Sequence, residues 1–125
     1  MRAIVDTHVL IWWLNDASKL SERVRHLLAD RSADFIVSAA TIWEISIKER
    51  LGKLPPMGAR LPALIERNGF ARLAIDHRHA RLAGELPGDH RDPFDRMLAA
   101  QSVIEGVGIV STDTAFVSLG IVAIW

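Results

Sequence analysis

Short, wholly apolar runs, separated by segments with helical patterning, constrain the fold of this chain more than any other feature. The runs lack the alternation of apolar and polar residues that marks a strand with one wet face, so they predict strands buried on both sides. Strands that alternate with helices form parallel sheets covered by helices on both faces. The predicted strands are residues 2–6, 34–38, 70–75, 107–111 and 121–125.

Helices are predicted between these strands from apolar spacing and from residues that favour helix ends. Asp92 is a favourable N-cap, and Pro93 suits the first position of the helix that follows. Thr41 and Glu44 have the spacing of a capping box, and Glu44 stands four residues before Lys48, which favours an ion pair. The other predicted helices are residues 9–14, 39–51, 59–67, 77–86 and 114–119, and one that Ser18 or Ser21 begins and that ends near Asp30.

Four carboxylates are predicted to meet at the carboxyl edge of this sheet, where α/β proteins bind ligands. Asp6 ends the first strand, and Asp113 follows the fourth strand by two residues. Glu44 lies in the helix after the second strand, and Asp95 opens the helix before the fourth. Several like charges in one place need protons or a cation. Oxygen ligands without a thiolate or a histidine-rich motif suit Mg²⁺ or Mn²⁺, which can activate water to hydrolyse a phosphodiester.

Each of these acids also has an explanation that involves no ligand. Asp6 could be a turn or capping acid, although its place at a strand end favours function. Glu44 could serve only in the capping box and Asp95 only to complement the helix dipole, and for these two the alternatives weigh equally. Asp113 is better explained as an N-cap, and Asp92 is a cap first.

Other polar residues near this edge have similar alternatives. Ser111 and Thr112 either hydrogen-bond a ligand or close the fourth strand. His8 and His90 lie near the predicted site, but ordinary packing explains them better than contact with a substrate.

Further histidines and the tryptophans are assigned to the surface and the core. His77 and His79, two residues apart, do not share a helix face and are predicted to lie at the surface. Three tryptophans are predicted to be core residues, with stacking on a nucleic-acid base as the lesser alternative: Trp12, Trp13 and Trp43.

Composition limits the classes of protein that remain. At 125 residues the chain is predicted to form one domain, residues 1–125, with a single core. It has no cysteine, which excludes disulfides and thiolate catalysis. No apolar run is long enough to span a membrane and no signal peptide is recognised, so a soluble cytoplasmic protein is expected. A formal net charge of zero argues against a wholly basic nucleic-acid binder. Residues 45–72 do carry six lysines and arginines against two glutamates, which solvated helices explain best.

Four stretches of the sequence are typical of one family when they are taken together. They are IVDTHVLIWWL at residues 4–14, SAATIWEISIK at 38–48 followed by LGKL at 51–54, DPFDRMLAAQ at 92–101, and IVSTD at 109–113 with Phe116. These stretches resemble the PIN-domain ribonucleases, specifically the VapC-type toxins of bacterial toxin–antitoxin pairs. The resemblance covers almost the whole chain. It implies a three-layer α/β/α fold with a five-stranded parallel sheet, and an acidic pocket that binds Mg²⁺ or Mn²⁺.

The resemblance also implies roles for individual residues. The acids that hold the metal and act in catalysis are Asp6, Glu44, Asp95 and Asp113, with Asp92, Thr7 and Thr112 beside the site. Basic residues that could hold the RNA backbone are Lys48, Arg50, Lys53 and Arg96, although Lys48 could instead only pair with Glu44. Many PIN domains have asparagine two residues after the first acid, where this chain has His8.

Partners follow from the same resemblance. Toxins of this kind are typically homodimers that a cognate antitoxin inhibits, and RNA is the implied substrate. The chain shows no DNA-binding segment, so reading of an operator would belong to the antitoxin.

Two other functions stay open. One is a metal-dependent phosphatase on a similar α/β fold, but a haloacid-dehalogenase-like phosphatase needs a second acid where this chain has His8. The chain also lacks a glycine-rich phosphate loop that ends in Gly-Lys-Ser/Thr. The other is a catalytically weak PIN fold that only binds RNA, and the presence of all four acids counts against it.

Overall fold

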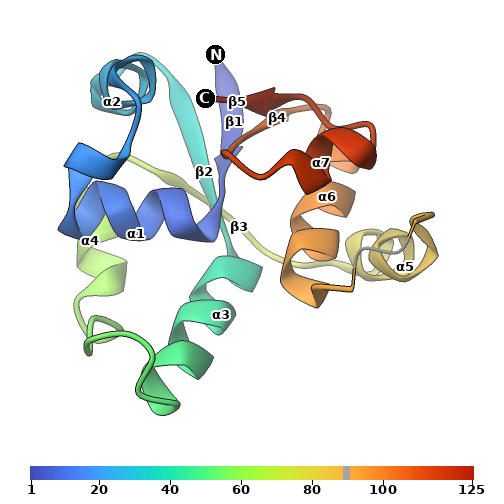
Figure 1. Ribbon diagram of the computed structural model, residues 1–125, viewed down its shortest axis with the longest axis horizontal. Helices are drawn as coiled ribbons and strands as arrows, with labels where there is room; N and C mark the ends of the chain where they lie inside the picture. Colours follow the sequence, from blue (N-terminus) through green and yellow to red (C-terminus); the bar gives the residue numbers. More distant parts are fainter. Residues whose placement is uncertain (89–90) are drawn as a thin grey trace.

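The strands form one five-stranded parallel sheet, as the apolar runs predict (Figure 1). The computed structural model describes residues 1–88 and 91–125, so His90 lies outside the described residues. In sheet order the strands are β3 (Ala71–Leu73), β2 (Asp34–Ser38), β1 (Arg2–Val5), β4 (Gly108–Val110) and β5 (Ala123–Ile124). β1 pairs in parallel with β2 on one side and with β4 on the other. Asp6, Ala39 and Ser111 directly follow these three strands and therefore share one edge of the sheet.

Helices cover both faces of this sheet, which confirms the predicted three layers. Alternate residues of a strand face opposite ways: Ala3 and Val5 lie in one apolar core, and Ile4 lies in the other. The first core packs against α1 (Thr7–Asn15), α2 (Glu22–Ala29) and α4 (Leu61–Arg67). The second packs against α6 (Pro93–Glu105) and α7 (Thr114–Ser118), and α5 (His77–Glu85) packs on α6. Figure 1 shows the two groups of helices on the left and the right of the sheet.

Two further elements complete the fold. A short 3₁₀ helix, η1 (Ala17–Lys19), follows α1, and α3 (Ala39–Arg50) follows β2. α3 contributes Ile45 to the first core and Ala40 to the second. Among the described residues no helix is both long and apolar enough to cross a membrane.

Side-chain caps fix most helix starts, and one predicted cap is wrong. The Asp92 side chain accepts hydrogen bonds from backbone N–H groups and begins α6, as predicted. Of the two serines considered for the start of α2, Ser21 is the cap. The capping box at Thr41 does not form, because α3 begins three residues earlier with Ser38 as its N-cap. Thr41 is instead a buried residue within the helix. α4 begins at Leu61 rather than at residue 59, and the two edge strands are shorter than predicted.

Two predicted burial states are also wrong. Trp43 is 59% exposed on α3 rather than a core residue. His79 is only 1% exposed rather than a surface residue. Both outcomes depend on how α6 packs against α5 and α3, since His79 of α5 turns toward Glu105 of α6 and Trp43 of α3 contacts Phe94 of α6.

Candidate acidic site at the carboxyl edge of the sheet

Asp6 is the buried carboxylate at the end of the central strand β1. It occupies the N-cap position of α1, but its side chain makes no capping hydrogen bond. Its Oδ2 instead accepts a hydrogen bond of 2.6 Å from the Ser111 hydroxyl, at the end of the neighbouring strand β4. The side chain is only 5% exposed, and burial raises the pKa of Asp6 even though the Ser111 hydrogen bond opposes that rise. A carboxylate that is buried in this way and does not cap its own helix favours a functional role over a structural one.

Glu44 lies on α3 and is the second buried acid at this edge, 7% exposed. The two acids are brought together by a buried hydrogen bond of 3.1 Å that the Thr7 hydroxyl donates to the Thr41 hydroxyl. Thr7 follows Asp6 in the chain, and Thr41 lies one helical turn before Glu44. Asp6 and Glu44 also interact electrostatically, because the charge of Glu44 raises the pKa of Asp6 further. Lys48 partly compensates, with its Nζ 3.0 Å from Glu44, as the spacing predicts.

Asp113 is joined to Asp6 through Ser111. The Ser111 hydroxyl that donates to Asp6 also accepts a hydrogen bond of 3.0 Å from the Asp113 backbone N–H. The Asp113 carboxylate accepts from the Ala115 N–H at 2.9 Å and so caps α7, as the simpler explanation predicts. Thr112, between the two, is exposed. The sequence predicts Thr112 beside the site, whereas in the structure the neighbouring Ser111 bonds to Asp6. The pairing of β1 with β4, which the sequence does not show, brings Ser111 to Asp6.

Asp95 stands in the first turn of α6, one turn after the cap residue Asp92. Asp92 accepts hydrogen bonds from the backbone N–H groups of Phe94 and Asp95 and acts as the predicted N-cap. Phe94 contacts Trp43, whose chain neighbour is Glu44, with ring centroids 5.1 Å apart. The start of α6 therefore lies against the part of α3 that carries Glu44.

These acids do not form a complete set of metal ligands. Within residues 1–88 and 91–125, no three acidic, histidine or cysteine side chains are grouped closely enough to hold a metal ion. The structure couples Asp6 with Glu44 and links Asp113 to Asp6 through one serine. The Asp6–Glu44 pair does fit a divalent cation, because two nearby buried carboxylates repel each other and Mg²⁺ commonly binds through one or two carboxylates with water and phosphate as the other ligands. The convergence of all four acids remains a prediction.

The predicted RNA-binding cations differ in their surroundings. Arg50 and Lys53 are exposed at the end of α3, whereas Lys48 pairs with Glu44. Arg96 donates from its guanidinium to the backbone carbonyls of Ala83 and Leu86. These bonds hold the end of α5 against α6, a structural role that the sequence did not suggest.

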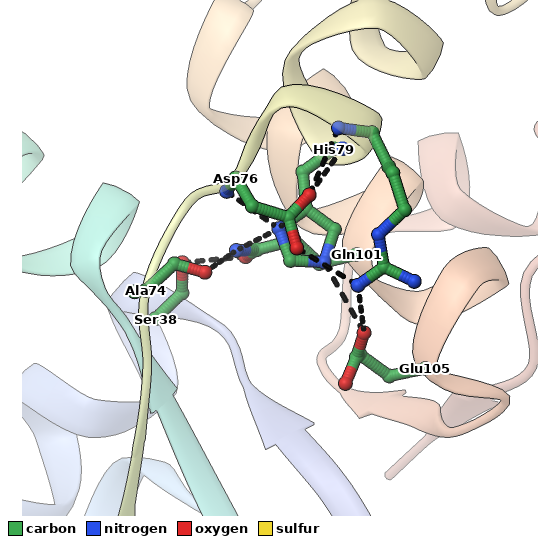
Figure 2. A network of polar contacts seen from close by, with 7 residues as sticks. Ser38, Ala74, Asp76, His79, Gln101 and Glu105 are labelled. Carbon is green, nitrogen blue, oxygen red and sulfur yellow. Dashed lines mark hydrogen bonds and ion pairs between the residues drawn. The ribbon is translucent and has the colours of Figure 1, made fainter.

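A buried network of polar contacts joins the start of α3 to α6 (Figure 2). The Ser38 hydroxyl donates to Oε1 of Gln101 on α6 at 2.5 Å and accepts from the Ala40 N–H at 3.0 Å. Gln101, fully buried, also donates to the Ala74 carbonyl at 3.3 Å. His79 bonds to the Asp76 N–H through Nδ1 and to Glu105 through Nε2. Ser38 lies six residues before Glu44, and Gln101 lies six residues after Asp95, so the network anchors both acid-bearing helices.

Comparison with known proteins agrees with this architecture. A family model described as PIN domain matches residues 3–122. Ribonuclease VapC16 of Mycobacterium tuberculosis is 36% identical over 66 residues, which are 50% of this chain and 47% of that protein. The chain thus spans about half the length of the curated relative it matches.

Two solved structures share the fold at low sequence identity. The structure of VapBC2 from Rickettsia felis, bound to a DNA fragment from its promoter, matches with a TM-score of 0.73 at 15% identity. That match covers 99% of this chain and 98% of the other. A toxin–antitoxin complex from Klebsiella pneumoniae matches with a TM-score of 0.63 at 18% identity, over 90% and 87% of the two chains.

Proposed function

Because the chain belongs to the PIN domain family, we propose that it is a Mg²⁺- or Mn²⁺-dependent endoribonuclease that acts as the toxin of a toxin–antitoxin pair. The observation that carries this proposal is the burial of two carboxylates, Asp6 and Glu44, at the carboxyl edge of the sheet, on segments that the Thr7–Thr41 hydrogen bond joins. Burial and a neighbouring negative charge both disfavour an ionised Asp6, and a divalent cation between the two acids would remove that cost.

The residues of this chain have distinct roles in the proposed reaction. Asp6 and Glu44 would hold the cation, and Asp95 and Asp113 would complete the site. A bound divalent ion supplies an activated water and stabilises charge on the phosphate that is attacked. Ser111 orients the Asp6 carboxylate through its 2.6 Å hydrogen bond.

The four basic residues predicted to hold RNA serve the substrate and the site differently. Lys48 holds Glu44 in place and limits the repulsion between the two buried acids. Arg50 and Lys53, both exposed, are suited to hold the RNA backbone by charge. Arg96 belongs to the packing of α5 on α6 and is the least suited of the predicted RNA contacts.

The partners are proposed on the same basis. The Rickettsia and Klebsiella structures are described as VapBC2 and as a toxin–antitoxin complex. A cognate antitoxin is therefore the partner we propose for this chain, together with self-association into a homodimer.

The test is cleavage of a labelled structured RNA by the purified protein with Mg²⁺ or Mn²⁺, with and without EDTA. Asp6→Asn and Asp95→Asn should each abolish metal-dependent cutting while circular dichroism shows that both variants remain folded. Asp30→Asn, which changes an exposed acid in a turn, is the matched control and should cut normally. Cutting that survives both site substitutions would refute the assignment of the site. A folded protein that arrests no growth on expression and cuts no RNA would favour a module that only binds.

A further inference from the structure

An aromatic residue is exposed on α3 beside the acidic pair. Trp43 is 59% exposed, and it lies on one stripe of the helix with Ala39, Ser46 and Arg50, all of them exposed. Residues at these intervals of four, three and four share a helix face. The stripe ends in the Arg50 guanidinium, two turns or about 10 Å along the helix from Trp43. An aromatic ring and a guanidinium on one exposed helix face can contact the base and the phosphate of the same nucleic acid.

Trp43 also forms one wall of a small hollow between α3, α5 and α6. Its indole meets the Phe94 ring edge to face, with centroids 5.1 Å apart and planes at 74°. Ile75, Arg96 and Met97 are among the other residues that line it, and the hollow has a volume of about 260 Å³. This is less than the roughly 300–1,000 Å³ of sites for drug-sized ligands, and therefore suits one flat ring system better than a peptide helix.

The position of the hollow relates it to the proposed active site. Trp43 directly precedes Glu44, and Phe94 directly precedes Asp95. On α3 the Glu44 side chain turns inward to the acid pair while Trp43 turns outward. A ring bound in the hollow against these aromatic side chains would therefore lie near the helix segments that carry Glu44 and Asp95.

We propose that Trp43 and Phe94 form a stacking site for one unpaired base of the RNA substrate, with Arg50 holding the backbone further along α3. The contact is made through the ring face of the base, which every base offers, so the site recognises a base without reading its sequence. This inference rests on the proposed nuclease function and assigns one further substrate contact to it.

The experiment separates recognition of bases from attraction to phosphates. Affinity is measured in EDTA, where no metal-dependent cutting occurs, for a fluorescein-labelled oligoadenylate and for an equally long ribose-phosphate oligomer without bases. The unaltered protein should prefer the oligoadenylate by about 5- to 150-fold, the range for one stacked base. Trp43→Ala should abolish most of this preference and Trp43→Phe should keep part of it. Arg50→Ala should weaken binding of both oligomers alike.

Ile42→Ala is the matched control, because Ile42 is the adjacent exposed apolar residue on α3 and lines a different cavity. It should leave the preference for bases unchanged. An unchanged preference in Trp43→Ala, or no preference in the unaltered protein, would overturn the inference. A change from dimer to monomer in Trp43→Ala with base preference intact would also overturn it and would assign this face to a second copy of the chain. Loss of cutting in Asp6→Asn is independent of these results, so failure of the nuclease proposal is distinguishable from failure of the stacking site.

Discussion

The hydrogen bond between Ser38 and Gln101 should couple the stabilities of α3 and α6 (Figure 2). Ser38→Ala removes the N-cap of α3, worth about 1 kcal/mol, and leaves the buried Gln101 carbonyl without its donor, worth about 1–3 kcal/mol. We therefore expect a total loss of about 2–4 kcal/mol in the free energy of unfolding. Gln101→Met keeps the volume of the side chain but removes the acceptor for Ser38 and the donor to Ala74, and should cost about 2–3 kcal/mol.

A double-mutant cycle isolates the shared contact, because both single variants lose the same hydrogen bond. The double variant should therefore cost about 1–2 kcal/mol less than the sum of the two. Urea unfolding in EDTA measures each free energy, and the denaturant slope should change little if the fold is retained.

Ser21→Ala provides the matched control for this cycle. Ser21 caps α2 as Ser38 caps α3, but its hydroxyl takes no part in the network around Gln101. Ser21→Ala combined with Gln101→Met should be additive to within about 0.5 kcal/mol. Equal additivity in the Ser38 and Ser21 cycles would refute the coupling of the two helices through this bond.

Three further changes test other parts of the structure. Because burial raises the pKa of Asp6, its ionised form weakens the fold above that pKa, and stability should rise as pH falls through it toward the unfolded value. Asp6→Asn should thus raise the free energy of unfolding at pH 7 in EDTA and make that free energy less dependent on pH, as measured by urea titrations. An unaltered protein that is as stable as Asp6→Asn at pH 7, or more stable, would contradict this. Arg96→Met should lower the free energy of unfolding by about 2–3 kcal/mol, because the carbonyls of Ala83 and Leu86 lose charged donors. Amide hydrogen exchange in α5 should also become faster, and unchanged exchange would argue against those hydrogen bonds. Gly106→Ala should cost about 1 kcal/mol in thermal unfolding, since Gly106 ends α6 at φ 68° with open space where a Cβ would lie, and a neutral result would show that the helix end relaxes.

Most of the fold could be predicted because its signals are local. Apolar runs mark the strands, and Asp92 with Pro93 marks the start of α6. The start of α3 at residue 39 is also as predicted, but Ser38 is not identified as its cap, because Thr41 and Glu44 have the spacing of a capping box. The hydrogen bond that Ser38 donates to Gln101, 63 residues away in the chain, is a tertiary contact that no local pattern shows.

The burial of Trp43 and His79 could not be predicted for a related reason. A tryptophan within an apolar segment is most simply a core residue, and only the crossing of α3 with α6 leaves Trp43 exposed beside Phe94. His79 looked like a surface residue, because nothing in its own helix shows that Glu105 lies opposite. Contacts between helices that are far apart in the sequence determine whether these two side chains are buried.

The candidate acids are less distinctive in the sequence, because the edge of the sheet where strands end is also the edge where helices begin. An acid there is favoured as an N-cap or by the helix dipole whether or not a metal binds. Asp92 and Asp113 show this, since each caps a helix in the structure. Asp6 does not, because its carboxylate turns from its own helix to Ser111 and remains buried beside Glu44.

Capping and metal binding are nevertheless compatible, because a carboxylate has two oxygens and about four acceptor positions. Asp113 uses Oδ1 for the Ala115 N–H, so its role in α7 does not exclude a second partner. Capping hydrogen bonds therefore stabilise several carboxylates at this edge in the folded protein even without a bound cation. The cost of gathering negative charge then falls mainly on Asp6 and Glu44, which are buried together and do not cap. For this reason the proposed catalytic role rests on the Asp6–Glu44 pair rather than on the number of acids at this edge.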